Sequence, residues 1–200
     1  MLISLCDAFE KADRRQVAAT RRQDDVIDKL NTAIKAYITS LDPGALGDAD
    51  HQRVRGILAF ATNMEQAAGI VTKDLLGIVA KKIKRDLAFS ESGQIDLLAM
   101  LDRLLANVRT AASLAMTGDE RAARLLASEK KTFRGLEAAA TEAHFERLRS
   151  GRIDTAETSA LHLDALRYLK SVNAHLVAGA AYPLLESKGD LLPSRLRQDA

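Results

Sequence analysis

The chain has 200 residues and a formal net charge of +2, because 29 basic side chains nearly balance 27 acidic ones. Such a balance gives no strong field that would attract nucleic acid, so we expect no nucleic-acid partner. Aromatic residues make up 4% and tryptophan is absent, so aliphatic side chains must form the interior, which favours packed helices over a β-sandwich. The one cysteine, Cys6, excludes an internal disulfide and suits a reducing compartment.

Helix is the main prediction along the chain, since proline occurs only at positions 43, 183 and 193. The expected breaks are stretches rich in Gly, Ser and capping residues: 41–50, 90–93, 117–120 and 150–155. They leave predicted helical segments over 5–40, 49–89, 94–116, 119–149 and 155–186. Several of these exceed the usual helix length, and long helices need neighbours along their whole length. We therefore predict an all-α, elongated up-down bundle.

The first two segments carry apolar stripes at helical spacing. In 49–89, Ile57, Met64, Val71 and Ile78 recur every seven residues, and Glu65 lies at the edge of this stripe. In 5–40, the stripe predicted to be buried consists of Val26, Leu30, Ile34, Tyr37 and Leu41.

Acidic residues run beside that stripe. Asp24 and Asp28 lie one helical turn apart on the same face. Together with Glu65 on the next helix they could hold a cation, as facing carboxylates do in di-iron bundles, although such sites usually add histidine. The alternative is a solvated polar face whose acids pair with the basic residues Arg21, Arg22 or Lys29. Both interpretations remain open.

The last segment contains HLDALRYLKSVNAHL (162–176), in which His162 and Asn173 fall among the apolar residues of one face. A polar residue on a bundle seam more often fixes helix register through a hydrogen bond than binds a ligand. We therefore predict structural polar roles for both. On the opposite face, Asp164 and His175 are nearly three turns apart and form no site by spacing.

The order of the segments suggests an internal repeat. Segments 5–40 and 49–89 resemble 119–149 and 155–186, with 94–116 as the opening helix of a second three-helix unit. The division this implies is a first, incomplete repeat over 1–90, a second over 91–188 and a polar tail over 189–200. The first unit would then have a truncated opening helix.

The final segment SALHLDALRYLKSVNAHLVAGAAYPLLE, followed by LLPSRL at 191–196, resembles the PhoU-like cytoplasmic domain of bacterial sodium–phosphate cotransporters. Further stretches agree in the same order: DDVIDKLNTAIKAYITSL, RVRGILAFATNMEQAAGIVTKDLL and KKTFRGLEAAATEAHFERLRSG. The resemblance rests on this ordered set, which spans nearly the whole chain, rather than on any single motif. It implies tandem three-helix bundles preceded by a membrane region.

Several PhoU-like proteins bind iron or zinc clusters through E/D-x-x-x-D motifs on paired helices. The resemblance implies one such site here at Asp24, Asp28 and Glu65, but Gly69 stands where the last aspartate belongs. The site would therefore be degenerate.

The second repeat departs further from this motif. Glu137 matches one carboxylate, but Lys170 and Ala174 stand where a glutamate and an aspartate belong. An ammonium group would repel a cation, so no second metal site is expected.

The sequence contains no P-loop or dinucleotide fingerprint and suggests no Ser/His/Asp arrangement, so we expect no enzymatic activity and no catalytic residues. The resemblance implies a regulatory domain of a sodium–phosphate cotransporter on the cytoplasmic side of the inner membrane. Its partners would be the membrane domain of the transporter and a second copy in a homodimer. The alternatives are a free-standing PhoU-type phosphate-signalling adaptor, a carboxylate-bridged metalloprotein, and an interaction bundle with no ligand.

Overall fold

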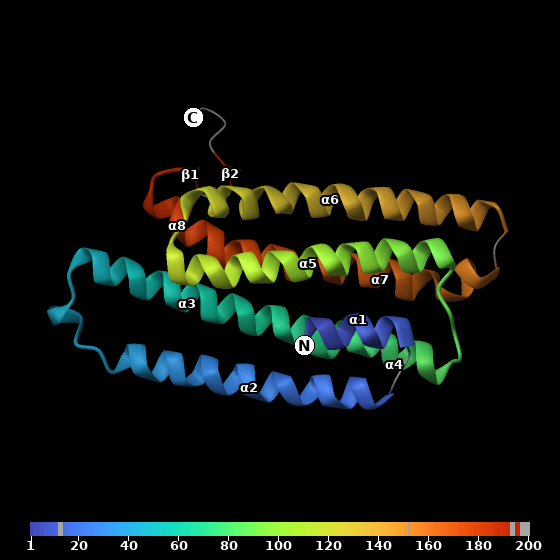
Figure 1. Ribbon diagram of the computed structural model, residues 1–200, viewed down its shortest axis with the longest axis horizontal. Helices are drawn as coiled ribbons and strands as arrows, with labels where there is room; N and C mark the ends of the chain where they lie inside the picture. The colour runs from blue at the N-terminus through green and yellow to red at the C-terminus, as the bar shows by residue number, and fades with distance from the viewer. Residues whose placement is uncertain (12–13, 152, 193–194, 197–200) are drawn as a thin grey trace.

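The computed structural model describes residues 1–11, 14–151, 153–192 and 195–196. It is an elongated bundle of helices that run up and down its long axis (Figure 1), which confirms the all-α prediction. The α-helices are α1 (Leu2–Lys11), α2 (Arg14–Thr39), α3 (Asp48–Gly69), α4 (Leu76–Lys84), α5 (Glu91–Thr117), α6 (Glu120–Arg149), α7 (Ile153–Leu176) and α8 (Tyr182–Ser187). In the described part of the chain, no helix combines the length and apolar character needed to cross a bilayer.

Three shorter features complete the secondary structure. A 3₁₀ turn, η1 (Pro43–Ala45), lies between α2 and α3. Two π-helical segments, η2 (Ile70–Leu75) and η3 (Val177–Ala181), join α3 to α4 and α7 to α8. The strands β1 (Leu191–Leu192) and β2 (Arg195–Leu196) pair antiparallel after α8.

Capping residues explain where α5 and α6 begin. The Ser90 side chain accepts a hydrogen bond from the backbone N–H of Gly93, and the Asp119 carboxylate accepts from those of Arg121 and Ala122. Between these helices Gly118 adopts φ +62°, the left-handed conformation that ends many helices. The breaks expected at 90–93 and 117–120 are therefore confirmed.

The prediction of one helix over 5–40 is wrong. The chain reverses direction between α1 and α2, which lie antiparallel (Figure 1). The reversal lets α1 bury Leu5, Ala8 and Phe9, each at most 1% exposed, against the body of the bundle. A straight helix would have carried these apolar side chains away from it.

The two halves of the chain have matching element orders. We call α1–α4 the first repeat and α5–α8 the second. Each has an opening helix, a second helix, and a third that passes through a π-helical segment into a short final helix. The boundary predicted at residue 90 falls on the N-cap of α5, and the division into domains stays a prediction.

One hydrophobic core joins the two repeats. Buried apolar residues of both halves form a single cluster, which includes Leu75 and Val79 from the first repeat and Leu166 and Leu169 from the second. Helices α3 and α7 pack against each other, and η3 packs on α3. The repeats therefore share their interior instead of each closing over its own.

The stripe predicted to be buried on α2 is largely exposed, which corrects that expectation. Val26, Leu30 and Tyr37 are 56%, 58% and 67% exposed, and Ile57 on α3 is 41% exposed. Among the described residues, helix α2 packs mainly on α3 and on the short α1, with fewer contacts to α4 and η2, so this face has little helical cover. Periodicity identifies an apolar face but not the neighbour that covers it.

Helix α3 and η3 approach each other closely at Gly179. A Cβ atom added at Gly179 would lie 2.8 Å from Asn63 Cβ. We expect Gly179→Ala to lower the free energy of unfolding by about 1 to 3 kcal/mol, because two packed helices must separate. Urea denaturation followed by circular dichroism measures this change.

The matched control is Gly135→Ala in α6, where an added Cβ meets no atom within 4 Å. This change should leave stability unaltered or raise it by up to about 1 kcal/mol, because alanine favours helix. Equal stability of Gly179→Ala and Gly135→Ala would contradict the close packing of α3 on η3.

Candidate functional site

The structure places the predicted metal ligands on α2 and α3 but does not gather them. Asp24 Oδ2 accepts a hydrogen bond of 2.8 Å from Thr72 Oγ1. Glu65 Oε2 accepts a hydrogen bond from Asn31 Nδ2 and lies 3.6 Å from Lys35 Nζ. Asp28 is exposed on α2. The acids face protein partners or solvent.

The metal site therefore has no geometric support in this structure. Within the described residues, no group of three or more His, Cys, Asp or Glu side chains is placed to hold a metal ion. The carboxylates of Asp24 and Glu65 are already satisfied by a hydroxyl, an amide and an ammonium group. An iron or zinc site at these residues stays a prediction from the sequence.

In the second repeat, an ion pair occupies the corresponding position. Lys170 on α7 donates to Glu137 on α6, and the Glu137 side chain is only 18% exposed. The ammonium group supplies the positive charge that a half-buried carboxylate needs. Lys170 departs from the metal-binding motif, and it pairs directly with Glu137, the carboxylate that matches that motif.

Asn173 is buried on the apolar side of α7, where its spacing predicts it to lie. Its Oδ1 accepts a hydrogen bond of 2.8 Å from Asn107 Nδ2 on α5. Asn107 Nδ2 also donates to Glu129 Oε2 on α6 at 3.1 Å. A chain of hydrogen bonds thus links α5, α6 and α7 inside the second repeat. Its donors and acceptors meet only when the helices are aligned, so the chain favours one helix register.

Arg103 completes this chain at the surface. Its guanidinium makes two hydrogen bonds to Glu129, with Nε–Oε2 and Nη2–Oε1 distances of 2.6 and 2.7 Å. These bonds hold the pKa of Glu129 below its ordinary value, although burial opposes them. Sequence reasoning missed Arg103, Asn107 and Glu129. The only signal was the i, i+4 spacing of the first two on α5, which does not reveal the partner helix.

His162 lies in a second buried polar cluster, where α5, α6 and α7 meet. Its Nε2 is 3.1 Å from the carbonyl oxygen of Gly93. A carbonyl only accepts, so Nε2 carries the proton and Nδ1 holds the lone pair. No described residue hydrogen-bonds to this Nδ1. Burial lowers the pKa of His162 to about 4, so the ring is neutral at physiological pH.

His144 stacks on His162, with ring centroids 5.0 Å apart and planes 15° from parallel. Its Nε2 lies 2.8 Å from Ser159 Oγ, and burial lowers its pKa as well. Nearby, Arg147 Nη2 is 3.5 Å from Asp96 Oδ2. Burial raises the pKa of Asp96, whereas Arg147 acts in the opposite direction. The histidines contribute neutral packing surface rather than charge, and the structural role of His162 stays a prediction.

His175 joins the two repeats. Its Nδ1 is 3.0 Å from Asn63 Oδ1, so the polar face of α7 meets α3 rather than water at this point. Asp164, on the same face, pairs with Arg167 one turn away on α7 itself. His175 and Asp164 therefore have separate partners, as their spacing predicts.

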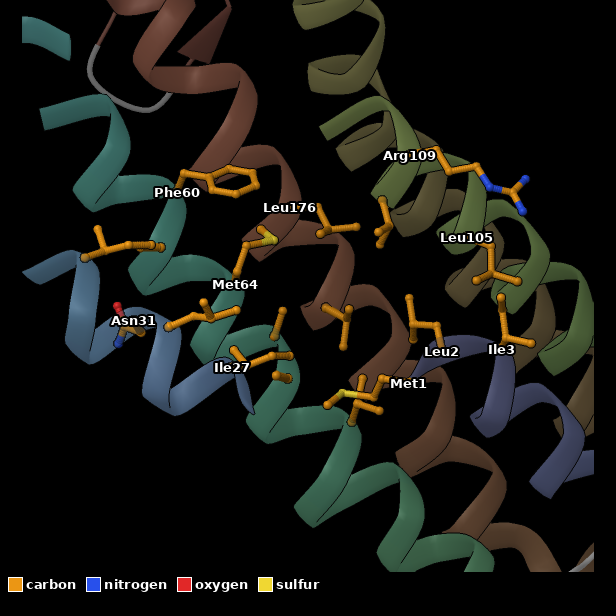
Figure 2. Close-up of a pocket in the computed structure, with 18 residues that line it drawn as sticks. Met1, Leu2, Ile3, Ile27, Asn31, Phe60, Met64, Leu105, Arg109 and Leu176 are labelled. Atoms are coloured by element: carbon orange, nitrogen blue, oxygen red, sulfur yellow. The ribbon is translucent and has the colours of Figure 1, made fainter. Parts of the chain in front are cut away.

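An apolar groove of about 540 Å³ lies at the N-terminal end of α1 (Figure 2). Its walls come from α2, α3, α5 and α7, with Met1, Leu2 and Ile3 at one end. The polar lining residues are Asn31, which donates to Glu65, and the exposed Arg109. The other residues that line it include Ile27, Leu30, Ile34, Phe60, Met64, Leu105, Val108 and Leu176. An apolar groove between helices suits another helix better than a small charged ligand.

The low pKa of His162 makes stability depend on pH. The unfolded ring binds a proton near pH 6.5 and the folded ring only near pH 4, so the stabilisation is complete above pH 6.5 and is lost as pH falls toward 4. We expect a decrease of up to about 3 kcal/mol in the free energy of unfolding over this range. Urea unfolding at a series of pH values measures it.

His162→Gln should weaken this dependence, because an amide can still donate to the Gly93 carbonyl but does not titrate. The same change at His51, which is partly exposed on α3 and outside this cluster, is the control and should leave the dependence in place. A slope that His162→Gln does not alter would contradict the assignment.

Comparison with known proteins connects most of the chain to one group of bacterial proteins. Over 172 residues, 86% of this chain, it is 36% identical to the "Putative inorganic phosphate export protein YjbB" of Salmonella typhimurium. It is 34% identical over the same length to the proteins of that name from Escherichia coli K12 and Shigella flexneri. The match covers 32% of each relative, so the chain spans about a third of their length. No family model and no solved structure matches the chain.

Proposed function

We propose that this chain is a PhoU-like, non-enzymatic regulatory domain of a phosphate transporter, positioned on the cytoplasmic side of the inner membrane. The observation that carries the proposal is the identity of 34–36% over 172 residues with proteins named for phosphate export. The order of the matching motifs in the sequence supports the PhoU-like assignment. The repeated three-helix arrangement of the bundle is consistent with it.

The length of the relatives beyond the matched stretch supports a regulatory role for this chain rather than a part in the transport step itself. Moving phosphate through a bilayer requires chain that spans the membrane. Two-thirds of each relative lies outside the stretch that resembles this chain. We assign the transport path to that part and its regulation to the helical bundle, whose partner would then be the membrane domain.

The chemistry of the bundle also favours a role in helix–helix contact over a role in catalysis. Carboxylates between the helices are bound to neighbouring side chains, as in the Glu137–Lys170 and Glu129–Arg103 pairs. The groove is mainly apolar and suits helix docking. We therefore propose that regulation acts through helix–helix contacts. A sodium-coupled mechanism and a homodimer are further parts of this proposal.

A chimeric exporter tests the proposal. The matched 172 residues of the Salmonella relative are deleted, or replaced by the corresponding stretch of this chain, and phosphate release is measured in cells lacking other exporters. We expect the deletion to change the rate of release or its response to phosphate, and the replacement to restore it. Immunoblots of membranes control for the amount of each protein.

Two results would contradict the proposal: release that the deletion leaves unchanged, and release that this chain does not restore. Restoration by this chain supplied as a separate polypeptide would instead favour the free-standing signalling adaptor. A stoichiometric iron or zinc content that is lost on Asp28→Ala and Glu65→Ala would favour the metalloprotein.

A further inference from the structure

A second cavity, of about 510 Å³, lies at the end of the bundle where α3 begins and where α5 and α8 end (Figure 1). We call it the end cavity. Phe60 is the one residue that it shares with the lining of the apolar groove. Its volume falls within the range of about 300–1,000 Å³ that is usual for small-molecule sites.

Much of the lining of the end cavity is apolar. Leu114 on α5 is only 4% exposed, and Ile57 on α3 is 41% exposed. Further apolar lining comes from Phe60 on α3, Ala115 on α5, and Pro183 and Leu184 on α8. A hydrocarbon body that covered this surface would remove it from water, which is favourable.

Two cationic side chains line the same cavity from different elements. Arg53 lies in the second turn of α3, and Lys188 is the C-cap of α8. Two acids near them in sequence have other partners, since Asp50 accepts a backbone N–H at the start of α3 and Asp190 pairs with Arg124. Among the described residues, no acid lines the cavity and neither cation has an ion-pair partner.

We propose that the end cavity binds an amphipathic phosphate monoester, with the phosphate held by Arg53 and Lys188 and an apolar body on the side chains between α3, α5 and α8. Ligand sites commonly combine a mainly apolar lining with a few polar groups that fix orientation. This inference goes beyond a regulatory role in phosphate transport, because it rests on the lining of the cavity alone.

A phosphate monoester matches the charge of the site better than a carboxylate. It carries about −1.5 to −2 charges at neutral pH, against the two positive charges of Arg53 and Lys188. The arginine fork can donate two parallel hydrogen bonds to phosphate oxygens, and the lysine ammonium adds a compact positive charge. The amide of Gln52, which also lines the cavity, can donate a further hydrogen bond.

Calorimetric titration with octyl phosphate, at low salt, tests the inference. We expect octyl phosphate to bind at least about tenfold more tightly than inorganic phosphate, because only the ester carries the apolar body. Arg53→Gln and Lys188→Gln should each weaken its binding by about two- to fivefold, as the loss of one exposed charge pair does. Arg55→Gln, on α3 and outside the cavity, is the matched control and should leave binding unchanged.

A second pair of variants tests the apolar part of the site. Ala115→Phe should weaken octyl phosphate binding by about tenfold, because its ring takes the space of roughly two methylene groups of the ligand. Ala112→Phe, on α5 and outside the lining, should not weaken it. Both alanines are exposed, so neither change disturbs the core, and circular dichroism checks that each variant is folded.

Vesicles identify the source of the ligand. The chain is mixed with vesicles of phosphatidylcholine made with or without phosphatidate. Binding only to those with phosphatidate, weakened by Arg53→Gln, would assign the site to a lipid headgroup. Binding of octyl phosphate without binding to vesicles would assign it to a soluble phosphate ester.

Three results would overturn the proposal: no binding of octyl phosphate, equal affinity for octyl phosphate and inorganic phosphate, and an affinity that neither Arg53→Gln nor Lys188→Gln lowers. An equal loss in Arg55→Gln and Arg53→Gln would also overturn it, because binding would then follow the overall charge of α3 and not the cavity.

Discussion

The structure depends on the contact between α3 and α7, the third helices of the two repeats. Neither repeat closes its own apolar interior, and the shared core holds Leu75 and Val79 from one and Leu166 and Leu169 from the other. Gly179 lets η3 approach the side chain of Asn63, and His175 meets Asn63 from α7. Because burial of apolar surface is the dominant stabilising contribution, the α3–α7 contact provides the surface on which the other helices pack.

Charge within the bundle is neutralised by its own side chains. Glu65 lies near Lys35, Glu137 pairs with Lys170, and Glu129 pairs with Arg103. A half-buried carboxylate loses hydration, so a nearby cation or hydrogen-bond donor is needed to keep it ionised. Lysine meets that need at Glu65 and Glu137, the carboxylates that match the PhoU-like metal motif, and Arg103 meets it at Glu129. This pairing is the physical basis for proposing regulation by helix contacts rather than metal chemistry.

The sequence predicts the second repeat better than the first, for physical reasons. Ser90 and Asp119 are capping residues and Gly118 favours a left-handed turn, so the limits of α5 and α6 follow from local chemistry. The reversal between α1 and α2 has no proline or glycine to indicate it. Asn173 could be placed on a buried face by spacing, but its partner Asn107 lies 66 residues away and depends on the tertiary fold. Likewise, the periodicity of apolar residues identifies the apolar face of α2 but does not show how little of it the described helices cover.

The central claim is that the two repeats form one cooperative unit through α3 and α7. Native-state hydrogen exchange of the slowest amides in these two helices tests it most directly. Amides that open only on global unfolding share one opening free energy, equal to the stability from urea denaturation. The structure predicts that α3 and α7 give the same value. Exchange from α3 at a clearly lower free energy than from α7 would show that the first repeat opens alone, and would contradict the account.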